Sequence, residues 1–213
     1  MGVFVSQPSK PEASGVIAAT AMFVEVLVIG IGSFAALAGC VSAVAGYSNM
    51  HKAGPLLAST PASGAALAFS YALGVAVDRA ADFLLTPYRR KLRSRHFPSN
   101  VDYRLARRTV AESPHIAAMA DYARSRMRVC RGWVLNSLLL SIAAALLISR
   151  FPVQDRAILI TASVVLGGII AAGFFAAWMN ITETGYKKLS QQASEIGAIV
   201  PGQGDGATAT AST

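Results

Sequence analysis

Four long apolar runs constrain the fold of this chain more than any other feature of its sequence. They cover residues 16–46, 55–77, 133–149 and 157–179, and a helix needs about 20 mostly apolar residues to cross a bilayer. The third run is short, but Arg150 at its end has a side chain long enough to reach the headgroups. Only 14% of the 213 residues are charged, whereas soluble domains average about 25%. We therefore expect an all-α integral membrane protein with four transmembrane helices, and not a disordered chain or an ordinary soluble enzyme.

The positions of the lysines and arginines predict how these helices are oriented. Sixteen of the 19 cations would lie on one side of the membrane together with both termini, and only Lys52, Arg150 and Arg156 would lie on the other. Loops rich in Lys and Arg stay in the cytoplasm. We therefore expect a multi-pass protein of the plasma membrane, the inner membrane of a bacterium, with both termini cytoplasmic.

The same reasoning divides the chain into five segments. A cytoplasmic N-terminal segment (1–15) precedes the first two transmembrane helices (16–85). A basic helical cytoplasmic loop (86–132) separates them from the last two helices (133–179). The cytoplasmic tail (180–213) is rich in Gly, Ala and Thr near its end, and we expect it to be disordered from about residue 197.

Helix-start signals occur three times in the basic loop. Thr86-Pro87 has the form of an N-cap followed by proline at the first helical position, which predicts a helix starting at Pro87. The spacing of Ser99 and Asp102 matches a capping box and predicts a helix that ends near residue 112. Ser113-Pro114 repeats the cap-and-proline signal.

The helix predicted to start at Pro114 carries an apolar stripe from Ile116 to Val134, with Met119 and Met127 on it. Gly132 is the single helix-breaking residue before the third apolar run, so we expect this helix to continue into the membrane. The stripe needs a cover, which the 101–112 helix, another subunit or the membrane surface would provide.

The cations of the basic loop have two interpretations. In the first, they set the topology and contact anionic headgroups, each contributing about 1 kcal/mol near such a surface. In the second, they recognise an acidic partner; nucleic acid fits that role poorly, because stacking aromatics are few and no binding motif is present. The candidate contact residues are Arg89, Arg90, Lys91, Arg93, Arg95, Arg104, Arg107, Arg108, Arg124, Arg128 and Arg131.

Glu25 is the one acid within an apolar run, and it also has two interpretations. A carboxylate inside the hydrocarbon is costly, so it would face other helices, stay protonated or line a water path as a polar site. The first run is, however, 31 residues long, or about 46 Å as a helix. The span would then begin after Glu25 and leave its carboxylate near the headgroups.

Catalytic motifs are incomplete or absent. Gly74, Asp78 and Asp82 form a G-x3-D-x3-D segment that resembles the second half of the motif of CDP-alcohol phosphatidyltransferases, whose acids hold metal ions. Residues 55–73 contain no acid, so the other half of the motif is missing. The local prediction is instead that Arg79 pairs with Asp82. We expect no catalytic residues, no metal site and no cofactor.

These observations lead to two functional hypotheses. The first is a non-enzymatic interaction or regulatory membrane protein, whose basic helices contact anionic lipid or an acidic protein partner. The alternative is a small ion or solute channel or transporter that uses Glu25 and the Gly/Ala helix faces in a homo-oligomer.

Overall fold

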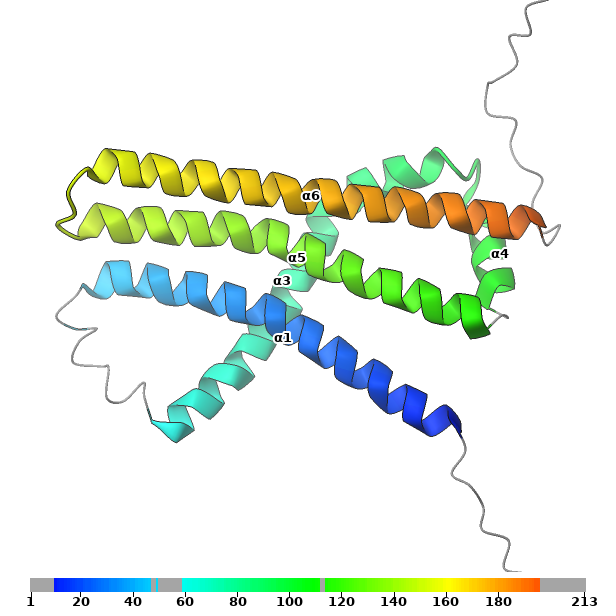
Figure 1. Cartoon of the computed structure of the whole chain (residues 1–213), viewed down its shortest axis with the longest axis horizontal. Helices are drawn as coiled ribbons and strands as arrows, with labels where there is room; N and C mark the ends of the chain where they lie inside the picture. Colours follow the sequence, from blue (N-terminus) through cyan, green and yellow to red (C-terminus); the bar gives the residue numbers. More distant parts are fainter. Residues whose placement is uncertain (1–9, 47–48, 50–58, 112–113, 196–213) are drawn as a thin grey trace, which may run out of the picture. The chain divides into compact units, whose positions relative to one another are not determined.

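The chain is helical throughout most of the residues that its computed structural model describes, 10–46, 49, 59–111 and 114–195. Five helices follow one another, and no strand occurs in those ranges (Figure 1). They are α1 (Lys10–Ala45), α3 (Thr60–Ser94), α4 (Asn100–Ala111), α5 (Pro114–Arg150) and α6 (Arg156–Glu195). All except α4 are long and apolar enough to cross a membrane. The predicted all-α class and the four long apolar helices are therefore confirmed.

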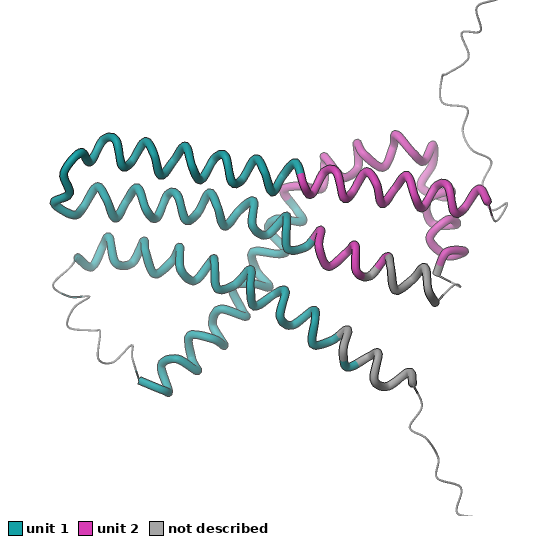
Figure 2. The backbone as a smooth tube through the Cα atoms, in the orientation of Figure 1, with its two compact units in different colours: residues 1–83, 128–176 teal, residues 84–127, 177–213 magenta. Residues whose placement is uncertain are grey.

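The helices divide into two compact units, drawn in different colours in Figure 2. Unit 1 contains residues 1–83 and 128–176, and unit 2 contains residues 84–127 and 177–213. Helices α3, α5 and α6 each contribute one part to each unit.

In unit 1, α1 and α3 cross at two glycines. A Cβ atom on Gly30 would overlap the carbonyl oxygen of Ser70, and a Cβ atom on Gly74 would overlap that of Val26. The missing side chains allow the two backbones to touch, as small residues do between closely packed helices. The rings of Phe23 and Tyr71 stack next to the crossing, with centroids 5.0 Å apart.

Helix α5 packs against both α1 and α6 in unit 1. Ile29 of α1 is fully buried and lies against Gly132, where a Cβ atom would stand 2.7 Å from the Ile29 side chain. On the α6 side, the rings of Trp133 and Phe174 stack with centroids 5.9 Å apart. Gly132 therefore leaves room for a neighbouring side chain without ending the helix, and the predicted continuity of α5 through this residue is confirmed.

Two other predicted helix starts are also confirmed. The hydroxyl of Ser99 accepts hydrogen bonds from the amides of Val101 (3.2 Å) and Asp102 (3.1 Å), and it donates to the Asp102 carboxylate (2.7 Å). This arrangement resembles a capping box, and α4 begins directly after Ser99. Helix α5 begins at Pro114, as the proline signal predicts.

The helix start predicted at Pro87 is wrong. Helix α3 continues without interruption through Pro87 to Ser94. Proline removes one hydrogen bond from a helix interior and crowds the preceding turn. An established helix of about seven turns precedes this point and extends past the single defect, which is why the local signal misled.

The core of unit 2 is small and aromatic. Phe97, Ala106 and Ala193 are buried, and Tyr103 and Tyr186 pack against them. All three pairs of the rings of Phe97, Tyr103 and Tyr186 meet edge to face, with centroids 5.4 to 6.4 Å apart.

Helix α6 supplies a cover for part of the α5 stripe, which was not among the predicted covers. The Thr182 hydroxyl oxygen lies 3.3 Å from the sulfur of Met127, while it donates to the Trp178 carbonyl at 2.7 Å. The side chains of Ile116 and Met119 lie outside the described residues, as do the N-terminal residues 1–9 and the tail segment that we expect to be disordered.

Candidate functional site

The strongest polar cluster of unit 1 is an ion-pair network built on α1, α3 and α5. Its centre is Arg131, which donates to Asp78 Oδ1 through Nε (3.1 Å) and Nη2 (2.8 Å). Its Nη1 atom donates to Asp82 Oδ1. Asp78 and Asp82 are four residues apart on α3, so both carboxylates lie on the helix face that meets α5.

Glu25 joins the network through a second arginine. Arg128 Nη1 lies 3.4 Å from Glu25 Oε2, and Arg128 Nε lies 4.0 Å from Asp78 Oδ2. Arg128 and Arg131 are three residues apart, which places them on one face of α5. Arginines on one turn of α5 therefore pair with carboxylates of both α1 and α3.

These ion pairs matter for stability because their carboxylates are buried. The side chain of Asp78 is 3% exposed and that of Glu25 is 12% exposed. A buried carboxylate without a partner is strongly unfavourable, whereas a hydrogen-bonded partner offsets most of the desolvation cost. Three carboxylates and the two guanidiniums of Arg128 and Arg131 meet in this network. Its ion pairs hold α5 against α1 and α3.

A buried amide extends the polar contacts along α5. Asn136 is fully buried, and its Nδ2 donates to the Ile29 carbonyl at 2.7 Å. Its Oδ1 accepts a hydrogen bond from the Ser33 hydroxyl at 2.7 Å. Gly32 makes the room, because a Cβ atom there would stand 2.6 Å from Asn136 Nδ2. Sequence reasoning missed Asn136; a lone Asn within an apolar run was the available signal.

The structure thus places Glu25, Arg128 and Arg131, three of the predicted site residues, in one network. Of their partners, the sequence predicts only a local pair of Asp82 with Arg79, and it predicts no partner for Asp78. Arg79 lies 4.0 Å from Asp78 Oδ2 but is 74% exposed. The sequence therefore identified Glu25, Arg128 and Arg131 as candidate site residues, but it did not show which residues of other helices they pair with.

The other predicted contact residues lie in unit 2. They occupy the C-terminal part of α3, the turn directly after it, the helix α4 and the first half of α5: Arg89, Arg90, Lys91, Arg93, Arg95, Arg104, Arg107, Arg108 and Arg124. Arg95 lies 3.6 Å from Glu183 of α6, and Arg124 Nε donates to the Ala120 carbonyl at 3.3 Å.

Two of these cations stack on one aromatic ring. The guanidinium carbons of Arg93 and Arg107 lie 5.2 and 6.0 Å from the ring centroid of Tyr103. Arg93 and Tyr103 also line a surface pocket together with Asn100 and Arg104. The end of α3 and the start of α4 thereby bring several cations to one place in unit 2.

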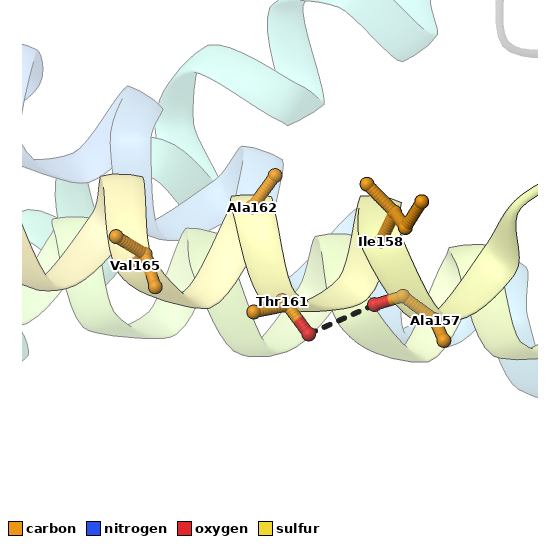
Figure 3. Close-up of a pocket in the computed structure, with 5 residues that line it drawn as sticks. All are labelled: Ala157, Ile158, Thr161, Ala162 and Val165. Atoms are coloured by element: carbon orange, nitrogen blue, oxygen red, sulfur yellow. Dashed lines mark hydrogen bonds between the residues drawn. The ribbon is translucent and has the colours of Figure 1, made fainter.

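A second hollow lies on α6 in unit 1 and offers little chemistry. It is lined by Ala157, Ile158, Ala162, Val165 and Thr161, and the Thr161 hydroxyl donates to the Ala157 carbonyl at 2.8 Å (Figure 3). Its other side chains are apolar. Among the described residues, no group of three or more His, Cys, Asp or Glu side chains is arranged to hold a metal ion.

Comparisons with known proteins leave the site to be interpreted from its own geometry. No protein family, curated protein or solved structure matches the chain.

Proposed function

We propose that this chain is a multi-pass membrane protein without enzymatic activity, and that its basic helices contact anionic lipid headgroups on the cytoplasmic side. The apolar surface of unit 1 supports the membrane part of the proposal. Ile158 is 67% exposed and Ile169 is 64% exposed on α6, and Val44 of α1 is 85% exposed. Exposed apolar surface on this scale requires an apolar cover, and lipid provides one for all four long helices.

The charge division between the units supports the orientation. Unit 2 carries twelve Lys and Arg residues against six acids, whereas unit 1 carries seven against five. By the positive-inside rule, the chain segments of unit 2 belong on the cytoplasmic side of an inner or plasma membrane. Both termini then lie on that side as well.

One contrast carries the lipid-contact proposal. Arg128 and Arg131 point to carboxylates within unit 1, but Arg90, Lys91 and Arg108 of unit 2 are exposed. Exposed cations next to a membrane are attracted by anionic headgroups. We therefore assign lipid contact to the cations of α3 and α4, and a structural role to Arg128 and Arg131.

Cysteine labelling tests the topology. Single cysteines replace Arg108 and Val153 in a variant whose Cys40 and Cys130 are changed to Ala. We expect a membrane-impermeant maleimide to label position 153 in intact cells and position 108 only after permeabilisation. Labelling of position 108 from outside would overturn the orientation, and a chain that purifies without detergent would overturn the membrane assignment.

Lipid retention tests the contact role. The detergent-purified chain is incubated with equal amounts of phosphatidylglycerol and phosphatidylcholine, and bound lipids are counted by native mass spectrometry. We expect a preference for phosphatidylglycerol that weakens when Arg90, Lys91 and Arg108 are changed to Gln. Changing Lys52, Arg150 and Arg156 to Gln removes the same charge and should have a smaller effect. Equal retention of the two lipids by the unaltered chain would contradict the proposal.

A channel or transporter built around Glu25 is the second candidate function. At Gly168 and Gly173 of α6, no neighbouring atom lies within 4 Å of the position that a Cβ atom would take, which suits close approach of a second copy. Glu25, however, already lies against Arg128, and this pairing favours a structural role. Ion flux in proteoliposomes that disappears in Glu25→Gln would reverse the ranking.

A further inference from the structure

Unit 2 contains a pocket in which two of the four lining residues are arginines. Four residues line it: Arg93 from the end of α3, and Asn100, Tyr103 and Arg104 from the first turns of α4. Its volume is about 320 Å³, which lies at the lower end of the range of about 300–1,000 Å³ for small-molecule sites. This is enough for a headgroup-sized ligand.

The two guanidiniums of the pocket keep their charge available. Within the described residues, Arg93 and Arg104 form no ion pair with a carboxylate, unlike Arg95, which pairs with Glu183. Arg104 uses its Nε atom to donate to the Asn100 carbonyl at 3.3 Å. This bond anchors the side chain, and its terminal nitrogens remain as donors at the fork of the guanidinium.

The positions of the pocket residues are held by their neighbours. The Arg93 guanidinium lies 5.2 Å from the ring centroid of Tyr103, and that ring packs edge to face on Phe97 and Tyr186. A cation stacked on an aromatic ring loses less freedom when it binds a ligand. The pocket is therefore organised before any ligand arrives.

The helix terminus itself is not the source of the binding chemistry. The amides of Val101 and Asp102 already donate to the Ser99 hydroxyl, and the Tyr103 amide donates to the Ser99 carbonyl at 3.3 Å. The Asp102 carboxylate is held by the same Ser99 hydroxyl and does not line the pocket. The two arginines are thus the charged groups that the pocket offers to a ligand.

We propose that this pocket binds a phosphate group, with Arg93 and Arg104 donating to its oxygens. Planar guanidiniums match the geometry of phosphate, and two of them match the charge of a phosphomonoester dianion. The proposal rests on the proposed function, because a cytoplasmic basic surface at the membrane meets phosphate-bearing headgroups. The same chemistry would also bind free phosphate.

The experiment measures binding of dioctanoyl phosphatidic acid to the full chain in a neutral detergent, with dioctanoyl phosphatidylcholine as the reference lipid. The test variant changes Arg93 and Arg104 to Gln. The control changes Lys187 and Lys188 of α6 to Gln; both are exposed residues of unit 2 that do not line the pocket and are not among the cations assigned to lipid contact. We expect the test variant to bind phosphatidic acid at least about tenfold more weakly, as loss of charge-assisted hydrogen bonds implies, and the control less than about threefold more weakly.

A further variant guards against misfolding, and competition distinguishes the ligand sources. Arg104→Gln alone leaves the Arg93–Tyr103 stack in place and should weaken binding by an intermediate factor.

Competition by millimolar inorganic phosphate would support recognition of the phosphate group itself, and binding without such competition would support a lipid headgroup as the ligand. Equal losses in the test and control variants would overturn the pocket while leaving the proposed function standing. A chain that binds phosphatidic acid and phosphatidylcholine equally would overturn both.

Discussion

Arg131 donates to a single oxygen of Asp78 through two nitrogens, at 3.1 and 2.8 Å, although the two residues lie 53 positions apart in the sequence. The contact joins α3 to α5, and Asp78 is almost completely buried. A third nitrogen of the same guanidinium reaches Asp82. Arg131 therefore pairs with two carboxylates of one helix, and the loss of its charge would leave both without this partner.

Replacing Arg131 by Gln should destabilise the protein by about 3 kcal/mol, because a buried carboxylate loses its main partner. Thermal unfolding in detergent measures the change. The double variant Asp78→Asn/Arg131→Gln should lose less stability than Arg131→Gln alone, since the most deeply buried carboxylate is then no longer charged. Arg79→Gln removes an exposed cation near the same carboxylate and should cost less than about 1 kcal/mol. Equal effects of Arg79→Gln and Arg131→Gln would show that the ion pairs of Arg131 do not stabilise the contact between α3 and α5.

Replacing Asn136 by Leu should cost about 1–2 kcal/mol. The Leu side chain cannot donate to the Ile29 carbonyl or accept from Ser33. Leu139→Ala, at an exposed position of the same helix, provides the control and should change stability less. Unfolding of both variants by denaturant in detergent makes the comparison, and a neutral Asn136→Leu would argue against the buried amide as a stabilising contact.

Gly30→Ala and Gly74→Ala should each destabilise unit 1 by about 1–3 kcal/mol, because the new methyl group overlaps the backbone of the facing helix. Gly168→Ala and Gly173→Ala are matched controls. Both sit in helix α6 with open space around them, so the higher helix propensity of alanine should leave stability unchanged or raise it by up to about 1 kcal/mol. Thermal unfolding of the four variants should separate them into these two groups, and similar destabilisation in all four would contradict the tight α1–α3 crossing.

Ser99→Ala should weaken the start of α4 by about 1 kcal/mol, since two amides lose their acceptor. Hydrogen exchange of the amides of Val101 and Asp102 measures the local effect, which we expect to be faster exchange at both. Ser99→Asp keeps a side-chain acceptor and should preserve most of the protection. Unchanged exchange in Ser99→Ala would mean that the capping box contributes nothing in solution.

Features that depend on neighbouring residues were predictable from the sequence. The capping box at Ser99, the start of α5 at Pro114 and the continuity of α5 through Gly132 all depend on a few adjacent residues. The helix start predicted at Pro87 also depended on adjacent residues alone, and it was wrong. The preceding turns of α3, which that local signal does not include, extend the helix past the proline.

The sequence by itself determined that the chain is helical, that four of its helices are long and apolar, and that its cations gather around α3 and α4. Only the tertiary structure decided that Glu25 and Asp78 meet arginines of α5, and that Asn136 meets Ile29. The physical reason is that helix formation and capping depend on residues within about one turn. Which faces of α1, α3 and α5 meet depends instead on the close packing of α1 and α3 at Gly30 and Gly74 and of α1 and α5 at Ile29 and Gly132. Spacing within a single helix does not encode these contacts.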